Sequence, residues 1–166
     1  EFLETISNYE KKESFPLSLD VKTLNKFIQS FSFNFTDGQK SAIENIKNSL
    51  KESSPSKVLI QGDVGCGKTI VAIIACFYTI NNGHQCLVLV PTEVLCNQHL
   101  KTFTQYLKTY GEVEMIIGKT KDNEKRRVKQ KLSNGEISVL IGTHALIYGE
   151  FQFKSLALVI IDEQHK

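Results

Sequence analysis

Apolar residues along this chain alternate between two kinds of segment. Short apolar runs, typical of strands buried on both faces, are separated by longer segments in which apolar residues recur at helical spacing. Strands that alternate with helices indicate a parallel α/β sheet. The expected strands cover residues 58–60, 86–90, 112–117, 137–141 and 156–161, and the expected helices cover residues 21–31, 37–50, 70–78, 93–110 and 121–132.

Polar residues and glycines mark where several of these helices begin and end. Asp20 precedes the first helical segment and Thr36 precedes the segment 37–50, and both are residue types that cap helix N-termini. Residues 81–83 (Asn-Asn-Gly) stop the helix before the second strand, and Gly111 breaks the helix after that strand. These signals give the order of the elements before any functional residue is considered.

The turn after the first expected strand has the spacing of a phosphate-binding loop. Gly62-Asp63-Val64-Gly65-Cys66-Gly67-Lys68-Thr69 fits the pattern G-x-x-x-x-G-K-[ST]. Glycines let the backbone fold around an anion with its N–H groups pointing inward, and the following helix N-terminus adds further donors. Lys68 supplies a cation for the β and γ phosphates of ATP, and Thr69 supplies a hydroxyl ligand for Mg²⁺. A glycine-rich turn with an accidental lysine is the alternative, which the strand–loop–helix context disfavours.

An aromatic segment precedes this loop by about two dozen residues. Phe31, Phe33 and Phe35 alternate with polar residues, which predicts a short extended segment packed on the core. Gln39 allows a sharper interpretation, because a glutamine amide can both donate to and accept from the edge of an adenine. The sequence therefore adds Gln39 to the candidate nucleotide-binding residues.

The last apolar run ends in two carboxylates that would complete the site. In an open parallel sheet, ligands bind at the carboxyl ends of the strands, which places Asp162 beside the phosphate loop. Asp162 is expected to hold the Mg²⁺ shell, and Glu163 to orient the water that attacks the γ-phosphate. Solvated loop charges are the alternative interpretation. Gln164 and His165 are either relay groups between ATP and another site or ordinary polar residues.

Composition adds little to the functional argument. The 166 residues suffice for one domain with a core, and a formal net charge of +2 does not by itself indicate a nucleic-acid partner. Residues 119–131 contain seven basic residues against Asp122 and Glu124. A solvated helix face is the favoured interpretation, with contacts to nucleic-acid phosphates as the alternative.

No cysteine or histidine has the spacing of a zinc site, and no signal peptide or membrane-spanning run is visible. His84 and His99 are expected to be surface or hydrogen-bonded histidines. Three cysteines fall in expected helices or strands, which suits buried, reduced thiols. Cys66 lies in the phosphate loop, where a helix N-terminus can lower a thiol pKa, although a small residue replacing Ser or Ala is the simpler interpretation. The four cysteines are Cys66, Cys76, Cys86 and Cys96.

Four blocks of this sequence carry a resemblance: residues 61–69, Pro91-Thr92-Glu93 with Gln98-His99, residues 141–146, and Asp162-Glu163-Gln164-His165. Together they resemble the RecG family of bacterial ATP-dependent DNA helicases. A fifth segment, Phe35-Thr36 with Gln39, is similar to the adenine-reading segment of that family. Cys66 departs from the family pattern at a usual serine, Ser32 at an expected proline and Lys166 at an expected arginine.

The resemblance implies a RecA-like P-loop NTPase fold, a three-layer α/β/α arrangement around a mostly parallel sheet. Residues 31–166 would be the N-terminal ATP-binding lobe of the motor, and residues 1–30 a linker and helix from a preceding wedge domain. The lobe would be incomplete, because the strand expected between the phosphate-loop strand and the acidic strand lies after residue 166. The second lobe with its arginine finger would also lie outside these residues, so we expect the 166 residues alone to bind nucleotide without unwinding DNA.

The resemblance also implies partners and further site residues. Pro91, Thr92, Gly118 and Thr143 match positions near which such lobes hold the DNA backbone. Gln164 and His165 match a segment that couples the ATP state to DNA contact, with ATP and Mg²⁺ as cofactors. The full protein would remodel stalled forks and branched DNA in the bacterial cytoplasm, during recombination and repair.

Other functions stay open on the sequence alone. One is the motor lobe of a translocase similar to the transcription-repair coupling factor, which shares the phosphate-loop block. Another is a nucleotide-binding switch module without motor activity, in which ATP only alters a partner surface. A third is a partial gene product with no activity.

Overall fold

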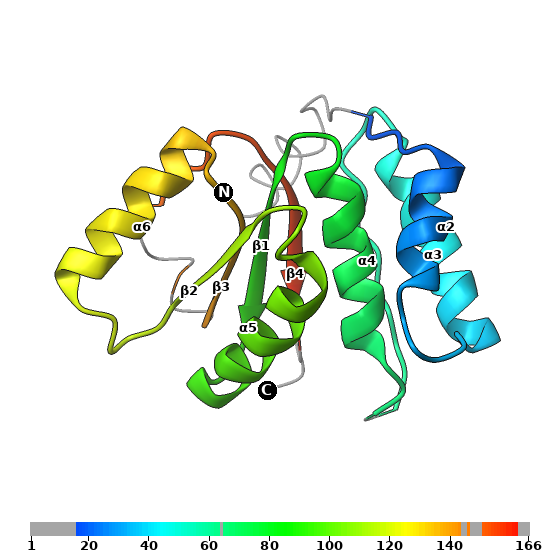
Figure 1. The fold of residues 1–166 in the computed structure, drawn as a ribbon, viewed down its shortest axis with the longest axis horizontal. Helices are drawn as coiled ribbons and strands as arrows, with labels where there is room; N and C mark the ends of the chain where they lie inside the picture. The colour runs from blue at the N-terminus through cyan, green and yellow to red at the C-terminus, as the bar shows by residue number, and fades with distance from the viewer. Residues whose placement is uncertain (1–15, 64, 144–145, 147–150, 163–166) are drawn as a thin grey trace, which may run out of the picture. The chain divides into compact units, whose positions relative to one another are not determined.

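The structure of this chain is a computed structural model that describes residues 16–63, 65–143, 146 and 151–162. The chain forms two compact units, Glu1–Tyr78 and Thr79–Lys166, each of which is described by itself. Figure 1 labels the helices and strands of both units.

The first unit is built from helices α2 (Val21–Gln29), α3 (Asp37–Leu50) and most of α4 (Lys68–Ile80). The expected caps of the first two helices are confirmed. Asp20 accepts a hydrogen bond from Thr23 N at 3.2 Å. Thr36 and Gln39 form a reciprocal capping box, in which each side chain binds the backbone N–H of the other.

Aromatic rings hold the three helices of this unit together. Phe27 of α2 stacks on Phe77 of α4 with 3.8 Å between ring centroids and 3° between ring planes. The expected extended segment at residues 31–35 is wrong in its backbone, because residues 31–33 form a bend. Phe31 and Phe35 are buried and Phe33 is 42% exposed, and the three rings pack against one another, so ring packing rather than strand pairing shapes this segment.

The strand expected before the phosphate loop is not present. Among the described residues, no strand pairs with Val58–Ile60, and Val58 and Leu59 are 45% and 70% exposed. A strand needs a hydrogen-bonded neighbour to satisfy its backbone groups. The apolar run at residues 58–60 has no such neighbour among the described residues, and alone it does not form a ladder.

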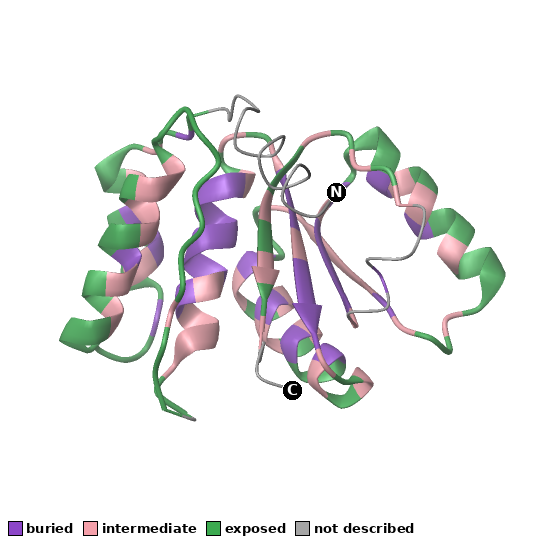
Figure 2. Ribbon diagram, turned by 180° about the vertical axis from the view of Figure 1, so that it is seen from behind, coloured by how far each residue is buried: buried purple, intermediate pink, exposed green. Residues whose placement is uncertain are grey.

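The second unit contains a parallel four-stranded sheet in the order β2-β3-β1-β4. Its strands are β1 (Gln85–Val90), β2 (Glu112–Ile116), β3 (Ile137–Thr143) and β4 (Leu156–Ile161). The two inner strands are almost fully buried, as their unbroken apolar runs predict (Figure 2). The edge strand β4 leaves Leu156, Val159 and Ile161 between 41% and 49% exposed.

Two helices connect the strands of this sheet, α5 (Glu93–Leu107) and α6 (Asp122–Asn134). The connection through α5 runs outward from β1 to β2, and the connection through α6 runs back to β3. Because both crossovers of parallel strands are right-handed, the two helices cover opposite faces. Leu89 and Leu140 pack with Val128 and Leu132 of α6 in one buried cluster.

Several element boundaries differ from the expected ones, three of them at functional or turn segments. Helix α5 ends at Leu107, before Gly111, because residues 108–110 form a turn. Helix α6 continues to Asn134, and Gly135 ends it with a φ of 80°, a left-handed conformation that suits glycine. Strand β3 extends to Thr143, so the expected loop residues Gly142 and Thr143 belong to the strand.

Gln85 is a buried polar residue that joins three segments at the amino end of the sheet. Its Nε2 donates to Leu132 O at 3.0 Å and to Ile137 O at 2.7 Å. Its Oε1 accepts from Ser155 N at 2.9 Å. The end of α6, the start of β3 and the start of β4 are thereby fixed to β1.

Replacing Gln85 should therefore destabilise the second unit. We expect Gln85→Leu to lower the free energy of unfolding by about 2 kcal/mol, because it leaves buried backbone groups without a partner. Urea unfolding followed by circular dichroism measures this change. The same substitution at the exposed Gln130 should change stability by less than about 0.5 kcal/mol, and an equal effect at both positions would contradict the role of Gln85.

Candidate active site

The phosphate-loop segment adopts the backbone that its glycines allow. Gly65 and Gly67 have φ values of 83° and 85°, which L-residues with a side chain rarely adopt. A Cβ at Gly62 would lie 2.6 Å from Cys66 Sγ, so the loop closes on itself there without room for a side chain. Helix α4 begins directly after this turn, at Lys68, and its first N–H groups are therefore available to an anion.

Lys68 points into the turn that precedes it. Its Nζ donates to the carbonyl oxygens of Gly62 and Asp63, the latter at 2.8 Å, and lies 3.8 Å from Cys66 Sγ. These three contacts come from both sides of the turn. The ammonium group of Lys68 is thus held within the loop, where the β and γ phosphates of ATP are expected to bind.

Gln39 forms a hydrogen bond with the phosphate loop, although it lies 27 positions before Cys66 in the chain. Its Nε2 donates to Cys66 O at 2.9 Å, while its Oε1 accepts from Thr36 N at 3.0 Å. A Cβ at Gly67 would collide with the Gln39 amide, so glycine is required there for close approach as well as for conformation. Gln39 therefore lies at the expected nucleotide site, and both ends of its amide bind backbone groups of the protein.

The carboxyl edge of the sheet brings five of the expected residues together. Pro91 and Thr92 follow β1, Gly118 follows β2 after one intervening residue, and Thr143 ends β3. Asp162 directly follows β4, and its N–H donates to Leu89 O at 2.8 Å. Parallel strands place all their carboxyl ends at one edge, which is where ligands bind in open α/β sheets.

Helix α5 begins with Glu93, a polar residue that was not among the expected site residues. Thr92 caps it by accepting from Leu95 N at 3.3 Å. Glu93 forms an ion pair with Lys119 at 3.5 Å, and its Oε1 lies 3.4 Å from the Cβ position of Gly118. These contacts tie the turn after β1 to the turn after β2, so the two expected DNA-contact segments form one surface.

His99 directly contacts Asp162, a residue of the expected site. Its Nε2 lies 3.0 Å from Asp162 Oδ2, and only 8% of its side chain is exposed. Its Nδ1 is buried and has no hydrogen-bond partner among the described residues. The expectation of a surface histidine is therefore wrong, and the alternative of a hydrogen-bonded histidine holds through Nε2. The signal was present in the sequence, because His99 shares a helical face with Cys96 and Phe103, and a polar residue on a buried face needs a polar partner.

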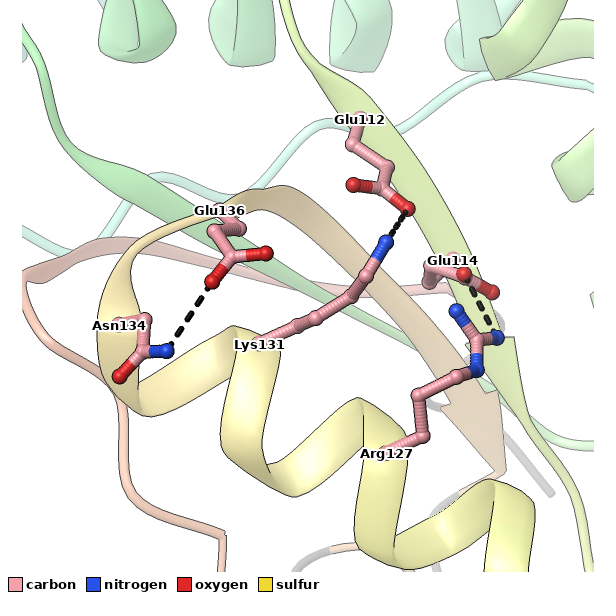
Figure 3. A network of polar contacts seen from close by, with 6 residues as sticks. All are labelled: Glu112, Glu114, Arg127, Lys131, Asn134 and Glu136. Carbon is pink, nitrogen blue, oxygen red and sulfur yellow. Dashed lines mark hydrogen bonds and ion pairs between the residues drawn. The ribbon is translucent and has the colours of Figure 1, made fainter.

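The basic side chains in and around α6 mostly form contacts within the protein (Figure 3). Arg127 forms an ion pair with Glu114 at 2.9 Å, and Lys131 with Glu112 at 2.7 Å, both across to β2. The hydrogen bond and the charge of Glu114 raise the pKa of the Arg127 guanidinium. Lys129 lies 5.1 Å from the centroid of the Phe151 ring. These contacts support the solvated-face interpretation of the segment over phosphate binding.

The four cysteines divide as expected into one exposed residue and three buried residues. Burial and, to a smaller extent, the charge of Glu93 raise the pKa of Cys96 to about 11. Cys96 is therefore a neutral thiol at physiological pH, which is poorly nucleophilic. Cys66 alone combines exposure with a position in the phosphate loop.

The oxygen ligands expected for Mg²⁺ fit the chemistry of that ion. Thr69 offers a hydroxyl and Asp162 a carboxylate, and Mg²⁺ takes one or two such protein ligands together with substrate phosphates and water. The described residues contain no group of three or more His, Cys, Asp or Glu that could hold a metal alone. None of the helices described is long and apolar enough to cross a membrane.

Several expected site residues lie outside the described residues. They are Val64 of the phosphate loop and Glu163, Gln164 and His165 of the acidic motif. The phosphate loop belongs to the first unit and Asp162 to the second unit. The two halves of the site are therefore each characterised within their own unit.

Comparison with known proteins places this geometry in a family. The pattern of the family described as DEAD/DEAH box helicase matches residues 36–166. The chain belongs to the DEAD/DEAH box helicase family. Among curated helicases of this kind, the ATP-dependent DNA helicase RecG of Aquifex aeolicus is 44% identical over 158 residues, which cover 94% of this chain and 20% of that protein. RecG of Thermotoga maritima is 42% identical, with 95% and 20% covered.

Solved helicase structures agree with this assignment. A structure of RecG bound to a three-way DNA junction matches with a TM-score of 0.89 and 40% identity, covering 99% of this chain and 23% of that chain. The UvsW helicase of bacteriophage T4 matches with a TM-score of 0.61 at 15% identity over 96% of this chain and 58% of that chain, which shows the fold alone. The expected RecA-like α/β fold and the resemblance to RecG are confirmed, and the chain spans about a fifth of the length of these RecG proteins.

Thiol labelling tests the environment of the cysteines. We expect N-ethylmaleimide to modify only Cys66 in the native protein and all four cysteines in urea, because the other three thiols are buried. Mass spectrometry of peptides counts the adducts. Cys66→Ser should remove the native adduct, and rapid native labelling of Cys96 would contradict the buried, neutral thiol.

A double-mutant cycle tests the role of the basic helix. We expect Arg127→Ala and Glu114→Ala to show a small coupling free energy that decreases in 1 M salt, as for other partly exposed pairs. Arg126, which donates to Asn123 in its own helix, provides the matched control and should show no coupling with Glu114. A decrease of about one in the salt slope of DNA binding on Arg127→Ala would instead indicate a phosphate contact.

Proposed function

We propose that this chain is the ATP-binding motor lobe of an ATP-dependent DNA helicase that remodels forked and branched DNA. The observation that carries the proposal is the match to junction-bound RecG, which extends over 99% of this chain at 40% identity. At this identity the match supports more than a shared fold. It supports a shared arrangement of the nucleotide site and of the DNA-contact segments.

In this proposal the first unit binds the nucleotide. The glycine turn and the start of α4 supply N–H donors to the phosphates, and Lys68 exchanges its contacts with the Gly62 and Asp63 carbonyls for phosphate oxygens. Gln39 reads the adenine edge while it remains bound to the loop. Thr69 and Asp162 would hold Mg²⁺, which stabilises the charge that develops on the transferred phosphoryl group.

The second unit supplies the hydrolytic and DNA-binding groups. Glu163 orients and polarises the attacking water, next to Asp162 at the carboxyl edge of the sheet. Pro91, Thr92, Gly118 and Thr143 hold the sugar-phosphate backbone at the same edge. Gln164 and His165 relay the nucleotide state to this surface.

The proposal also covers the parts of the protein on either side of this lobe. Residues 31–166 form the first RecA-like lobe, and residues 1–30 connect it to a preceding wedge domain. A second lobe provides the arginine finger, and the whole protein works on chromosomal DNA in the bacterial cytoplasm. The 166 residues alone bind nucleotide without unwinding DNA.

ATP hydrolysis by the full-length protein, with and without forked DNA, tests the function. We expect forked DNA to stimulate turnover, and Lys68→Ala to lower kcat by about 100-fold or more through loss of the phosphate-binding charge. Glu163→Gln should lower kcat by about 100-fold or more while ATP binding is retained, because it removes the group that activates water.

The exposed Gln152→Leu substitution on the segment before β4 serves as a control and should leave turnover unchanged. Binding of ATP with no turnover under any DNA condition would contradict the motor and favour a nucleotide-dependent switch. Stimulation by unbranched duplex that equals stimulation by forked DNA would contradict the proposed substrate class.

A further inference from the structure

His99 and Asp162 form a buried contact that the proposed hydrolytic roles do not use. His99 lies in the middle of α5, seven residues after the capping Thr92, and Asp162 follows the last residue of β4. Both residues belong to the second unit. Their 3.0 Å contact joins a helix on one face of the sheet to the carboxyl edge of its outer strand.

The position of His99 is fixed on its own side of this contact. The residue lies on the buried face of α5, and its ring stacks on Phe103 with 5.7 Å between centroids and 17° between planes. Only 8% of its side chain is exposed, compared with 28% for Asp162. The imidazole is therefore the fixed partner, and the carboxylate is the partner that reaches solvent.

The two ring nitrogens of His99 have different environments. Nε2 faces Asp162 Oδ2, while Nδ1 is buried with no hydrogen-bond partner among the described residues. A buried N–H without an acceptor is costly, so the nitrogen that donates is Nε2, which faces the carboxylate. His99 then donates one hydrogen bond from Nε2 to Asp162 Oδ2.

We propose that His99 is a positioning residue that holds the Asp162 carboxylate in the orientation needed to serve Mg²⁺-bound nucleotide. The Asp162 backbone is already fixed by its hydrogen bond to Leu89 O, so the His99 contact fixes the remaining freedom of the side chain. Hydrogen-bonded partners of this kind orient metal-binding carboxylates and leave their negative charge available to the ion. The proposal rests on the proposed function, in which Asp162 serves Mg²⁺.

Three variants of the full-length protein test this role. His99→Leu keeps a buried apolar side chain and removes the hydrogen bond. His99→Gln places an amide N–H where it can replace Nε2 as the donor. Phe103→Leu disturbs the packing around His99 and leaves the hydrogen bond in place, so it is the control for a purely structural effect.

Two measurements are made on each variant, and one of them needs no turnover. The first is the Mg²⁺ concentration that half-saturates DNA-stimulated ATP hydrolysis. The second is the affinity for a fluorescent ADP with Mg²⁺ and with EDTA. We expect His99→Leu to raise the half-saturating Mg²⁺ concentration by about 10–100-fold and to weaken ADP binding only when Mg²⁺ is present. We expect His99→Gln to recover most of both losses.

The outcomes separate this inference from the proposed function. Wild-type Mg²⁺ dependence in His99→Leu, or an equal shift in Phe103→Leu, overturns the positioning role while the helicase function stands. If the wild type hydrolyses no ATP but His99→Leu loses the Mg²⁺-dependent part of ADP binding, the proposed helicase function is contradicted and the positioning role is supported. Nucleotide binding that does not respond to Mg²⁺ in the wild type overturns both.

Discussion

The parallel ladder of β1 with its two neighbours is the constraint on which the second unit depends. β1 pairs with β3 on one side and with β4 on the other, so its register sets where both of those strands end. Val90 lies opposite Thr143, and Leu89 lies opposite Ile161, the residue before Asp162. A shift of one residue in this ladder would turn every side chain of a strand to the other face and remove the polar residues from their common edge.

The same principle of fixing polar groups through backbone contacts operates in the first unit. The phosphate loop lacks a strand ladder in front of it, and its position depends instead on the Gln39 amide and on the start of α4. Each unit thus has a hydrogen bond to the main chain at its part of the site, from Gln39 to Cys66 O in the first unit and from Asp162 N–H to Leu89 O in the second. Such preorganisation is what electrostatic catalysis of phosphoryl transfer requires.

Local signals predicted the elements well where the stabilising contacts are local. The caps at Asp20 and Thr36 and the helix stop at residues 81–83 depend on neighbours a few residues away, and the structure contains all three. Val58–Ile60 shows the limit, because an apolar run becomes a strand only when another segment pairs with it. His99 shows a second limit: its place on a buried helical face indicates that it needs a polar partner, but not that this partner lies 63 positions later in the chain.

The double attachment of Gln39 has a consequence for how this sequence can change. The contact spans 27 positions, yet the stretch 51–57 between its two ends is exposed throughout. Longer exposed loops cost little conformational entropy, so length variation is tolerated there while the amide keeps its two partners. The phosphate loop can therefore keep its geometry in related proteins in which the exposed segment 51–57 differs in length and composition.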